Sequence, residues 1–183
     1  MKKQGSFKVM FLVMLVSLVI ASLWDKLPAI KNSIHYVLNP TAGALMNWNL
    51  TIGMLIVVLI ISALTTVIQK YTTDQTELKR LKKEQKALQK EMKEHKSNPQ
   101  KMAELQKKQM AFIPQQFKLQ MGSIAYTAVP LILLFRWFGD YFGEIMTTTG
   151  EPVRFFGFLG WFLFYLIVTM VFSSLLKKWW DIA

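Results

Sequence analysis

Four long runs of apolar residues constrain this chain more than any other feature of its sequence. The run from Phe7 to Leu23 contains one charged residue, Lys8, and the runs at 52–68, 119–135 and 155–176 contain none. A helix needs about 20 apolar residues, with ~17 as the lower limit, to cross a hydrocarbon core of about 30 Å. The chain outside residues 70–118 is too apolar to cover four such helices with a polar layer. We therefore predict an all-α membrane protein with four spans.

The placement of positive charge predicts how the spans are oriented. The chain carries 22 Lys and Arg against 11 Asp and Glu, for a net charge of +11. If the spans alternate in direction, 18 of these 22 cations fall on one side, and only Lys26, Lys31, Arg136 and Arg154 fall on or near the other. The positive-inside rule assigns the cation-rich side to the cytoplasm. We predict a multi-pass protein of the plasma membrane, with its charged segment 71–113 and its C-terminus in the cytoplasm.

The first apolar run has two interpretations. Lys2 and Lys3, followed by an apolar stretch and a small residue at Ala21, are typical of a cleaved signal peptide. Trp24 and Lys26 are typical of the interfacial anchor of a retained span. The anchor pair favours retention, but both interpretations of residues 1–24 stay open on the sequence alone.

Periodicity and breaker residues divide the rest of the chain. Apolar residues three or four apart between 27 and 38 predict a short interfacial helix outside the membrane. No Gly or Pro lies between Gly53 and Pro99, so the second span is expected to continue as a helix into the cytoplasm. Pro114 is expected to interrupt the returning helix. The predicted segments are 1–24 (N-terminal span or signal anchor), 25–49 (outer interfacial segment), 50–70 (first core span), 71–113 (cytoplasmic hairpin), 114–138 (interfacial segment and second core span), 139–154 (outer loop) and 155–183 (third core span and basic tail).

The charged segment 71–113 carries two heptad-like patterns separated by a turn. Spacings of three and four recur at Leu78, Leu81, Gln85, Leu88 and Met92, and again at Met102, Leu105, Gln109 and Phe112. Ser97 or Asn98 is suited to cap a helix that has Pro99 in its first turn. The pattern predicts an antiparallel coiled-coil hairpin. Its basic surface fits contact with ribosomal RNA or anionic lipid, and equally a solvated charged surface.

The sequence contains no recognisable catalytic or metal-binding motif. It has no cysteine, and its two histidines, His35 and His95, are expected on opposite sides of the membrane. Paired carboxylates within a span, phosphate-binding glycine loops and metal-ligand spacings are likewise missing. We therefore expect a protein that is not an enzyme and that uses no cofactor or metal.

Hydroxyl and amide side chains in the spans gather toward their cytoplasmic ends. This shared bias predicts a partly hydrated recess, where a polar stretch of a substrate chain can keep hydrogen-bond partners inside the bilayer. At any single position, helix packing and back-bonding to the helix remain the alternative. The candidate groove-lining residues are Thr65, Thr66, Gln69, Gln116, Gln120, Ser123, Thr127, Thr169 and Ser173.

Methionines on or near the hairpin are candidates for contacting an apolar substrate, because a flexible thioether can pack around varied partners. The candidates are Met92, Met102, Met110 and Met121. Met92 and Met102 also suit the hairpin seam, whereas Met110 and Met121 are expected to be freer. Arg136 is expected to reach the outer surface or to pair with Asp140, in preference to a role in the recess.

The order of several short motifs resembles one known family. The motifs are MAFIPQQF at 110–117, Pro130 with WFGD at 137–140, GWF at 160–162 and LLKK at 175–178. Over about residues 43–183 the chain resembles the archaeal YidC-like proteins of the YidC/Oxa/Alb insertase superfamily, whose eukaryotic relatives include a core subunit of the ER membrane protein complex. The resemblance implies a three-helix core with a hydrophilic groove open to the cytoplasm and to lipid. It also implies that this groove helps nascent membrane proteins insert without ATP.

Residues 7–23 lie outside the core that this resemblance covers, and the second span lacks the arginine that bacterial members often place in the groove. We expect a membrane protein insertase or chaperone. Its expected partners are nascent membrane-protein chains, bilayer lipid and, through the basic hairpin, the ribosome, without sequence-specific binding to nucleic acid. Two other classes remain open, namely a membrane-anchored scaffold whose hairpin recruits a partner, and an ion channel or transporter, although the spans contain no acidic residue.

Overall fold

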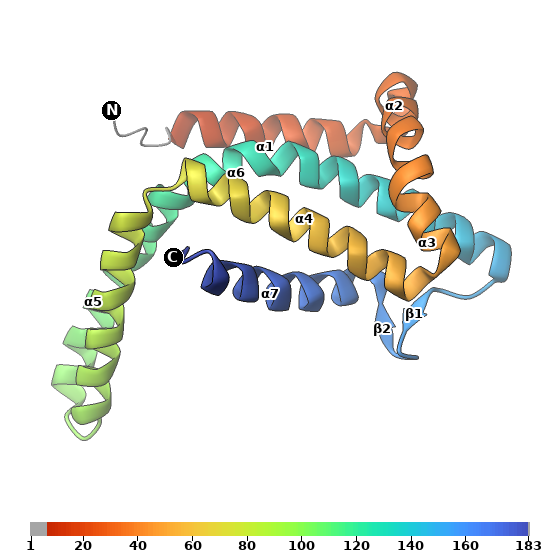
Figure 1. Ribbon diagram of the computed structural model, residues 1–183. Helices are drawn as coiled ribbons and strands as arrows, with labels where there is room; N and C mark the ends of the chain where they lie inside the picture. The colour runs from red at the N-terminus through yellow and green to blue at the C-terminus, as the bar shows by residue number, and fades with distance from the viewer. Residues whose placement is uncertain (1–6, 183) are drawn as a thin grey trace.

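The computed structural model describes residues 7–182, and nearly all of them are helical (Figure 1). The long helices α1, α4, α6 and α7 lie side by side, and α5 projects from one end of this bundle together with the start of α6. We call this the hairpin end and the opposite one the far end. The elements in chain order are α1 (Phe7–Ser22), the 3-10 turn η1 (Trp24–Lys26), α2 (Pro28–Leu38), the π-helical turn η2 (Asn39–Gly43), α3 (Ala44–Trp48), α4 (Leu50–Thr72), α5 (Gln75–Glu94), α6 (Pro99–Thr149), β1 (Arg154–Phe155), β2 (Leu159–Gly160) and α7 (Trp161–Trp179).

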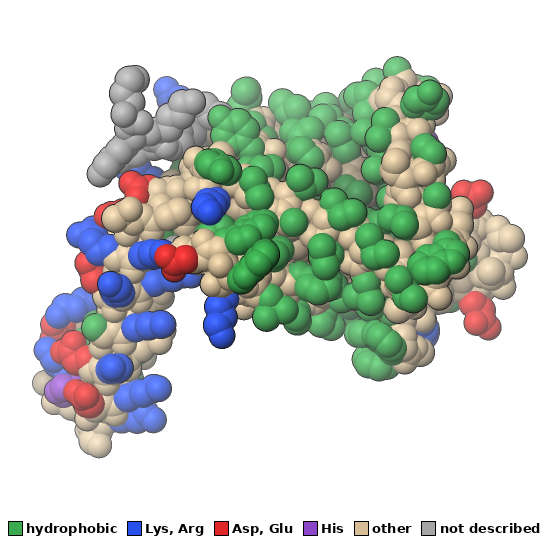
Figure 2. Space-filling view, in the orientation of Figure 1, with side chains coloured by type: hydrophobic (Ala, Val, Ile, Leu, Met, Phe, Trp, Pro, Cys, Tyr) green, Lys and Arg blue, Asp and Glu red, His purple; other side chains and the backbone are tan. Residues whose placement is uncertain are grey.

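Three helices of the described chain, α4, α6 and α7, are long and apolar enough to cross a membrane. Their large apolar side chains cover the bundle surface, and the charged side chains gather on the projecting hairpin (Figure 2). An apolar surface of this extent is stable in lipid, not in water. The prediction of an all-α membrane protein is confirmed.

Helix α1 is apolar but short. Its 16 residues extend about 24 Å, which is less than a hydrocarbon core of about 30 Å. It packs along α6, and Leu12 and Leu18 on its outer face are 61% and 65% exposed. Its crossing of the membrane as a fourth span therefore stays a prediction.

The expectation that α4 continues directly into the hairpin is wrong. Helix α4 ends at Thr72, because Thr73 and Asp74 adopt extended backbone conformations. The Asp74 carboxylate then accepts a hydrogen bond from the backbone N–H of Glu77 at 3.1 Å and so caps the beginning of α5. Aspartate is a strong N-cap residue, and it starts a new helix here without any Gly or Pro.

Helix α6 continues where a break and a loop were expected. It runs without interruption for 51 residues through Pro114 and Pro130 and ends at Gly150, whose φ of 77° lies in the left-handed region. The predicted interruption at Pro114 is therefore wrong, and residues 139–149 of the predicted outer loop are helical, whereas residues 150–153 are not. Each proline removes one backbone donor and costs about 3 kcal/mol in an isolated helix. Membrane helices accept this cost when their neighbours hold the helix in place.

Helix α7 begins at Trp161, later than the apolar run that starts at Phe155. The intervening residues form a short antiparallel hairpin in which Arg154 pairs with Gly160 and Phe155 pairs with Leu159. The ring of Phe155 stacks on that of Phe164 with centroids 4.1 Å apart. This stacking folds the strand pair back onto the first turn of α7.

The hydrophobic core of the bundle lies toward the far end. Aromatic side chains of α6, β1 and α7 meet there against the first half of α4 and against α3, and the fully buried members include Trp137, Phe138 and Phe164. Gly53 lets α4 approach α3 closely, because a Cβ atom at this position would lie 2.3 Å from the carbonyl oxygen of Leu45.

A polar network fastens η1 and α2 to α6 at the far end. The Asp140 carboxylate accepts hydrogen bonds from Trp24 Nε1 at 2.8 Å and from Lys31 Nζ at 3.2 Å, and it also contacts His35 Nε2 at 2.9 Å. Arg136 pairs with Asp25 at 3.2 Å. Of the two expected outcomes for Arg136, the pair with Asp140 is not formed, whereas the side chain does reach the surface, where it is 37% exposed.

Candidate functional site

One buried face of α4 changes its chemistry along the helix. Met54, Val58, Ser62 and Thr66 follow one another at intervals of four residues, and each is at most 2% exposed. Residues at this spacing share one face of a helix. The two members near the far end are apolar and join the aromatic core, whereas the two near the hairpin end carry hydroxyl groups. We call this face the α4 stripe.

The two neighbouring helices, α6 and α7, flank α4 and meet each other near the far end. Helix α4 packs extensively against both, and α6 with α7 is not among the extensively packed pairs of the described chain. Their ring contacts, such as Phe135 with Tyr165 at 4.9 Å and Phe142 with Trp161 at 5.5 Å, lie in the first turns of α7. Toward the hairpin end, α6 and α7 diverge, and α4 lies between them (Figure 1).

Most hydroxyl groups of this region bond to their own helix. Thr65 donates to the carbonyl of Ile61 at 2.8 Å, and Thr66 donates to that of Ser62 at 2.6 Å. On α6, Thr127 donates to the carbonyl of Ser123 at 3.0 Å. Such back-bonding satisfies the proton of each hydroxyl and leaves an oxygen lone pair to accept a further bond.

Four buried hydroxyls, those of Ser17, Ser62, Thr73 and Thr169, form no hydrogen bond of ordinary geometry among the described residues, and that of Thr169 lies beside the Tyr165 hydroxyl. Two of the four concern the helices α4 and α7. They are Ser62 Oγ on the α4 stripe and Thr169 Oγ1 on α7. A buried hydroxyl without a partner costs about 1–3 kcal/mol. Such groups in native proteins commonly serve a water molecule or a ligand. Helices α4 and α7 thus each contribute one such group near the middle of the helix.

The predicted groove residues divide between this region and the hairpin. Thr65, Thr66 and Gln69 lie on α4 and Ser173 on α7 in the halves nearer the hairpin, Gln120, Ser123 and Thr127 lie around the middle of α6, and Thr169 lies near the middle of α7. Gln116 lies elsewhere, because its amide donates to Gln85 Oε1 at 3.0 Å across the base of the hairpin. Ser62 was not among the predicted groove residues. Its spacing of four from Val58 and from Thr66 is the signal that could have identified it.

The hairpin buries the leucines that its heptad pattern predicts. Leu78, Leu81, Leu88 and Leu105 are at most 8% exposed, which confirms the seam between α5 and α6. Met92 and Met102 are half-buried beside it. The predicted freedom of Met121 is wrong, because its side chain is 3% exposed.

Met110, in contrast, is 67% exposed. Ile113 and Phe117, three and seven residues further along α6, are 61% and 45% exposed. These three side chains form an apolar strip on α6 that leads from the hairpin toward the bundle. We call it the α6 strip. The sequence prediction included only its methionine.

The charged side chains near the site lie on the hairpin and in the last turns of α4 and α7, which carry Lys70 and Lys177 with Lys178. Among the described side chains, no three His, Asp or Glu residues come close enough to hold a metal ion. The arrangement offers hydroxyl and amide groups on three membrane helices, with apolar surface on either side. Such groups can bind and position a polypeptide.

These features define a helical integral membrane protein with a core of three long helices, a projecting hairpin and a polar face within the bundle. The chain belongs to the EMC3/TMCO1-like family of integral membrane proteins, whose sequence model matches residues 35–183. This family belongs to the Oxa1/YidC/Alb3 insertase superfamily, which confirms the resemblance at the level of the superfamily. The match begins within α2 and leaves α1 and η1 outside. No curated protein and no solved structure gives a significant match to the chain.

Proposed function

We propose that this protein is a membrane protein insertase of the archaeal YidC-like type, which helps nascent hydrophobic segments enter the bilayer without ATP and without acting as an enzyme. The observation that carries the proposal is the α4 stripe. Its hydroxyl half carries Ser62 and Thr66 in the half of α4 nearer the hairpin, and Ser62 Oγ has no hydrogen-bond partner among the described residues.

The physical task of such a protein is to lower the cost of moving polar groups into lipid. Each unsatisfied backbone group in hydrocarbon costs several kcal/mol. Hydroxyl and amide groups that reach partway across the bundle give the polar flank of a substrate hydrogen-bond partners along a shortened path. The aromatic core closes this path at the far end. Partitioning of the apolar segment into lipid then supplies the driving force.

The α6 strip is placed to receive the substrate before it reaches the α4 stripe. Met110, Ile113 and Phe117 present exposed apolar surface at the base of the hairpin. A methionine can adapt to many apolar sequences, which suits a protein with varied clients. The half-buried methionines Met92 and Met102 add apolar surface at the hairpin itself.

We place the hairpin and the C-terminal segment in the cytoplasm and the bundle in the plasma membrane. The positive-inside distribution of Lys and Arg supports this orientation. Nascent chains and bilayer lipid are the partners that the proposal requires. A ribosome that contacts the basic hairpin would deliver the substrate at the correct end.

Site-specific photocrosslinking on stalled ribosomes tests the proposal. A crosslinking residue at Ser62, Thr66 or Thr169 is expected to capture a nascent membrane protein whose apolar segment has just emerged. The matched control is Leu64, which lies on the same turns of α4 but is 59% exposed on the surface of the bundle. Capture at Leu64 equal to that at the other three positions would refute the groove.

A functional assay separates an insertase from a scaffold. The double variant Ser62→Leu and Thr66→Leu fills the hydroxyl half of the stripe with apolar side chains. An insertase is expected to lose insertion of a test substrate in reconstituted vesicles while keeping its hairpin intact. A protein that only recruits a partner through the hairpin would tolerate this variant and would fail after deletion of residues 78–108.

A further inference from the structure

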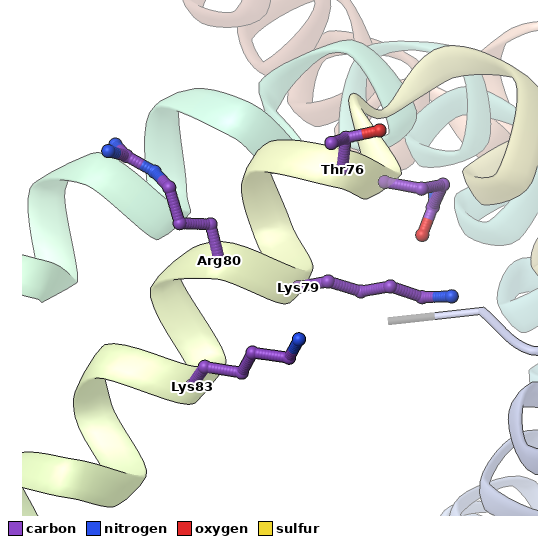
Figure 3. Close-up of a pocket in the computed structure, with 5 residues that line it drawn as sticks. Thr76, Lys79, Arg80 and Lys83 are labelled. Atoms are coloured by element: carbon purple, nitrogen blue, oxygen red, sulfur yellow. The ribbon is translucent and has the colours of Figure 1, made fainter.

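An open surface pocket lies along one side of α5 where the hairpin leaves the bundle. Its volume is about 490 Å³, and it is lined by Gln75, Thr76, Lys79, Arg80 and Lys83 (Figure 3). We call it the basic cavity. Lys79 and Lys83 extend toward the segment that follows α7, whereas Arg80 points to the opposite side of α5. Two of its three cations therefore face the same space.

The three cations differ in the number of acidic side chains with which they pair. Arg80 pairs with Glu77 and Glu84 on its own helix. Lys79 pairs with Asp181 from the segment after α7, across more than a hundred residues of sequence. Lys83 makes no ion pair among the described residues. The open side of the cavity thus carries one cation held by a single acid and one cation without an acid.

Asp181 reaches Lys79 with a strained backbone. Its φ of 50° lies in the left-handed region, which is costly for a residue with a side chain. Its side chain is 91% exposed, and its pairing with Lys79 lowers the pKa of the carboxyl below its usual range. A strained and exposed carboxylate is an easily displaced partner. Another anion can therefore take its place on Lys79.

The depth of the basic cavity indicates which anions can reach it. Helix α4 ends at Thr72, three residues before Gln75, and α7 ends at Trp179 beside the same region. Tyr71 and Trp179 at these two helix ends are 82% and 79% exposed. Exposed Tyr and Trp at helix ends mark the level of lipid headgroups. The cavity therefore opens at the depth where lipid phosphates lie.

We propose that the basic cavity binds the phosphate of an anionic phospholipid headgroup. Lys79 and Lys83 supply the charge, and Asp181 occupies Lys79 when no lipid is bound. Lysine ammonium groups bind phosphate as point charges that adapt to its position. A bound lipid would fix the angle between the hairpin and the bundle at the junction of α4 with α5. This role is separate from the proposed insertase groove.

The proposal is tested by native mass spectrometry of the full chain in detergent, titrated with dioleoylphosphatidylglycerol or with dioleoylphosphatidylcholine. The wild-type chain is expected to prefer the anionic lipid. The double variant Lys79→Gln and Lys83→Gln is expected to lose about 30-fold in affinity for it, at ~1 kcal/mol for each lysine near the membrane surface. The matched control is Lys90→Gln with Lys93→Gln, which removes the same charge from the other end of α5. Circular dichroism checks that each variant stays helical.

Asp181→Asn gives the sharpest result, because the proposal predicts an effect opposite to that of the lysine variants. Removal of this acid frees Lys79 and is expected to strengthen binding of dioleoylphosphatidylglycerol. Weaker binding by this variant, or equal losses in the two double lysine variants, would overturn the proposal. Equal binding of the zwitterionic lipid would do the same. Displacement of the lipid by millimolar inorganic phosphate would show a site for free phosphate, and tighter binding of a short RNA would show a nucleic-acid surface; either result also overturns it.

Discussion

Glycine replacements along α4 and α6 test the packing of the bundle with a graded series. At Gly53 a Cβ atom would lie 2.3 Å from the carbonyl oxygen of Leu45 and 2.6 Å from the backbone nitrogen of Met46. Both are backbone atoms, so α3 and α4 must move apart. At Gly122 the nearest atom, the carbonyl oxygen of Thr72, lies at 3.0 Å, and at Gly139 nothing lies within 4 Å.

All three replacements gain helix propensity, but they differ in how closely the new Cβ atom approaches its neighbours. Replacing glycine by alanine within a helix contributes about 1 kcal/mol in favour of folding. Overpacking costs about 1–3 kcal/mol, and the upper part of this range applies where only backbone can give way. Gly53→Ala is therefore expected to lose about 2 kcal/mol, Gly122→Ala to change little, and Gly139→Ala to gain up to ~1 kcal/mol.

The assay is thermal unfolding of the detergent-solubilised chain, followed by fluorescence of its tryptophans, of which Trp24 and Trp137 are buried. For a chain of this size, 1 kcal/mol corresponds to about 2–4 °C in the midpoint. The expected order of midpoints is Gly139→Ala, then Gly122→Ala, then Gly53→Ala. If Gly53→Ala unfolds at the same temperature as Gly139→Ala, the close contact of α3 with α4 is refuted.

Two further predictions concern polar contacts. Hydrogen bonds to Asp25 and Asp140 raise the pKa of Lys31. The stability that Lys31 contributes is therefore fully present below the ordinary lysine pKa of about 10.4, and it is lost as pH rises through the raised pKa. The difference in midpoint between wild type and Lys31→Met should therefore be constant near neutral pH and shrink in strong alkali, and a difference that grows with pH would contradict this. At the hairpin base, Gln85→Leu or Gln116→Leu alone should cost about 1 kcal/mol by leaving one amide unpaired, whereas the double variant should recover most of the loss in a double-mutant cycle. Additive losses would show that the two amides do not interact.

Sequence reasoning identified the elements that follow from periodic patterns. The apolar runs predicted the long helices, and the three-four spacing of Leu78, Leu81 and Leu88 predicted the buried seam of the hairpin. Both patterns depend on neighbours within one helix. Helix boundaries were less predictable, because they depend on competing local effects. Asp74 began a new helix where no Gly or Pro marked a break, and Pro114 failed to end one.

Contacts between distant segments were beyond what the sequence could predict. Trp24 and Asp140 are 116 residues apart, and only the packing of α1 and η1 along α6 brings them together. The same packing gives Arg136 a partner in Asp25. For the candidate site, the bias of hydroxyl groups toward one end of the spans was readable. The position of Ser62 on a fully buried face was not, because burial depends on where α6 and α7 lie.

The uninterrupted course of α6 has a mechanical consequence. Its 51 residues form one continuous helix that changes direction where the hairpin meets the bundle (Figure 1), so unbroken helical backbone joins the tip of the hairpin to the far end of the bundle. The other helix of the hairpin, α5, is not continuous with the bundle, because the backbone is extended at Thr73 and Asp74 between α4 and α5. A partner that binds the tip of the hairpin therefore acts on the bundle through the helical backbone of α6 and through the turn at Thr73 and Asp74. A force at the tip is thus transmitted along α6 to Asp140, where Trp24 and Lys31 bind this helix, without passing through a loop.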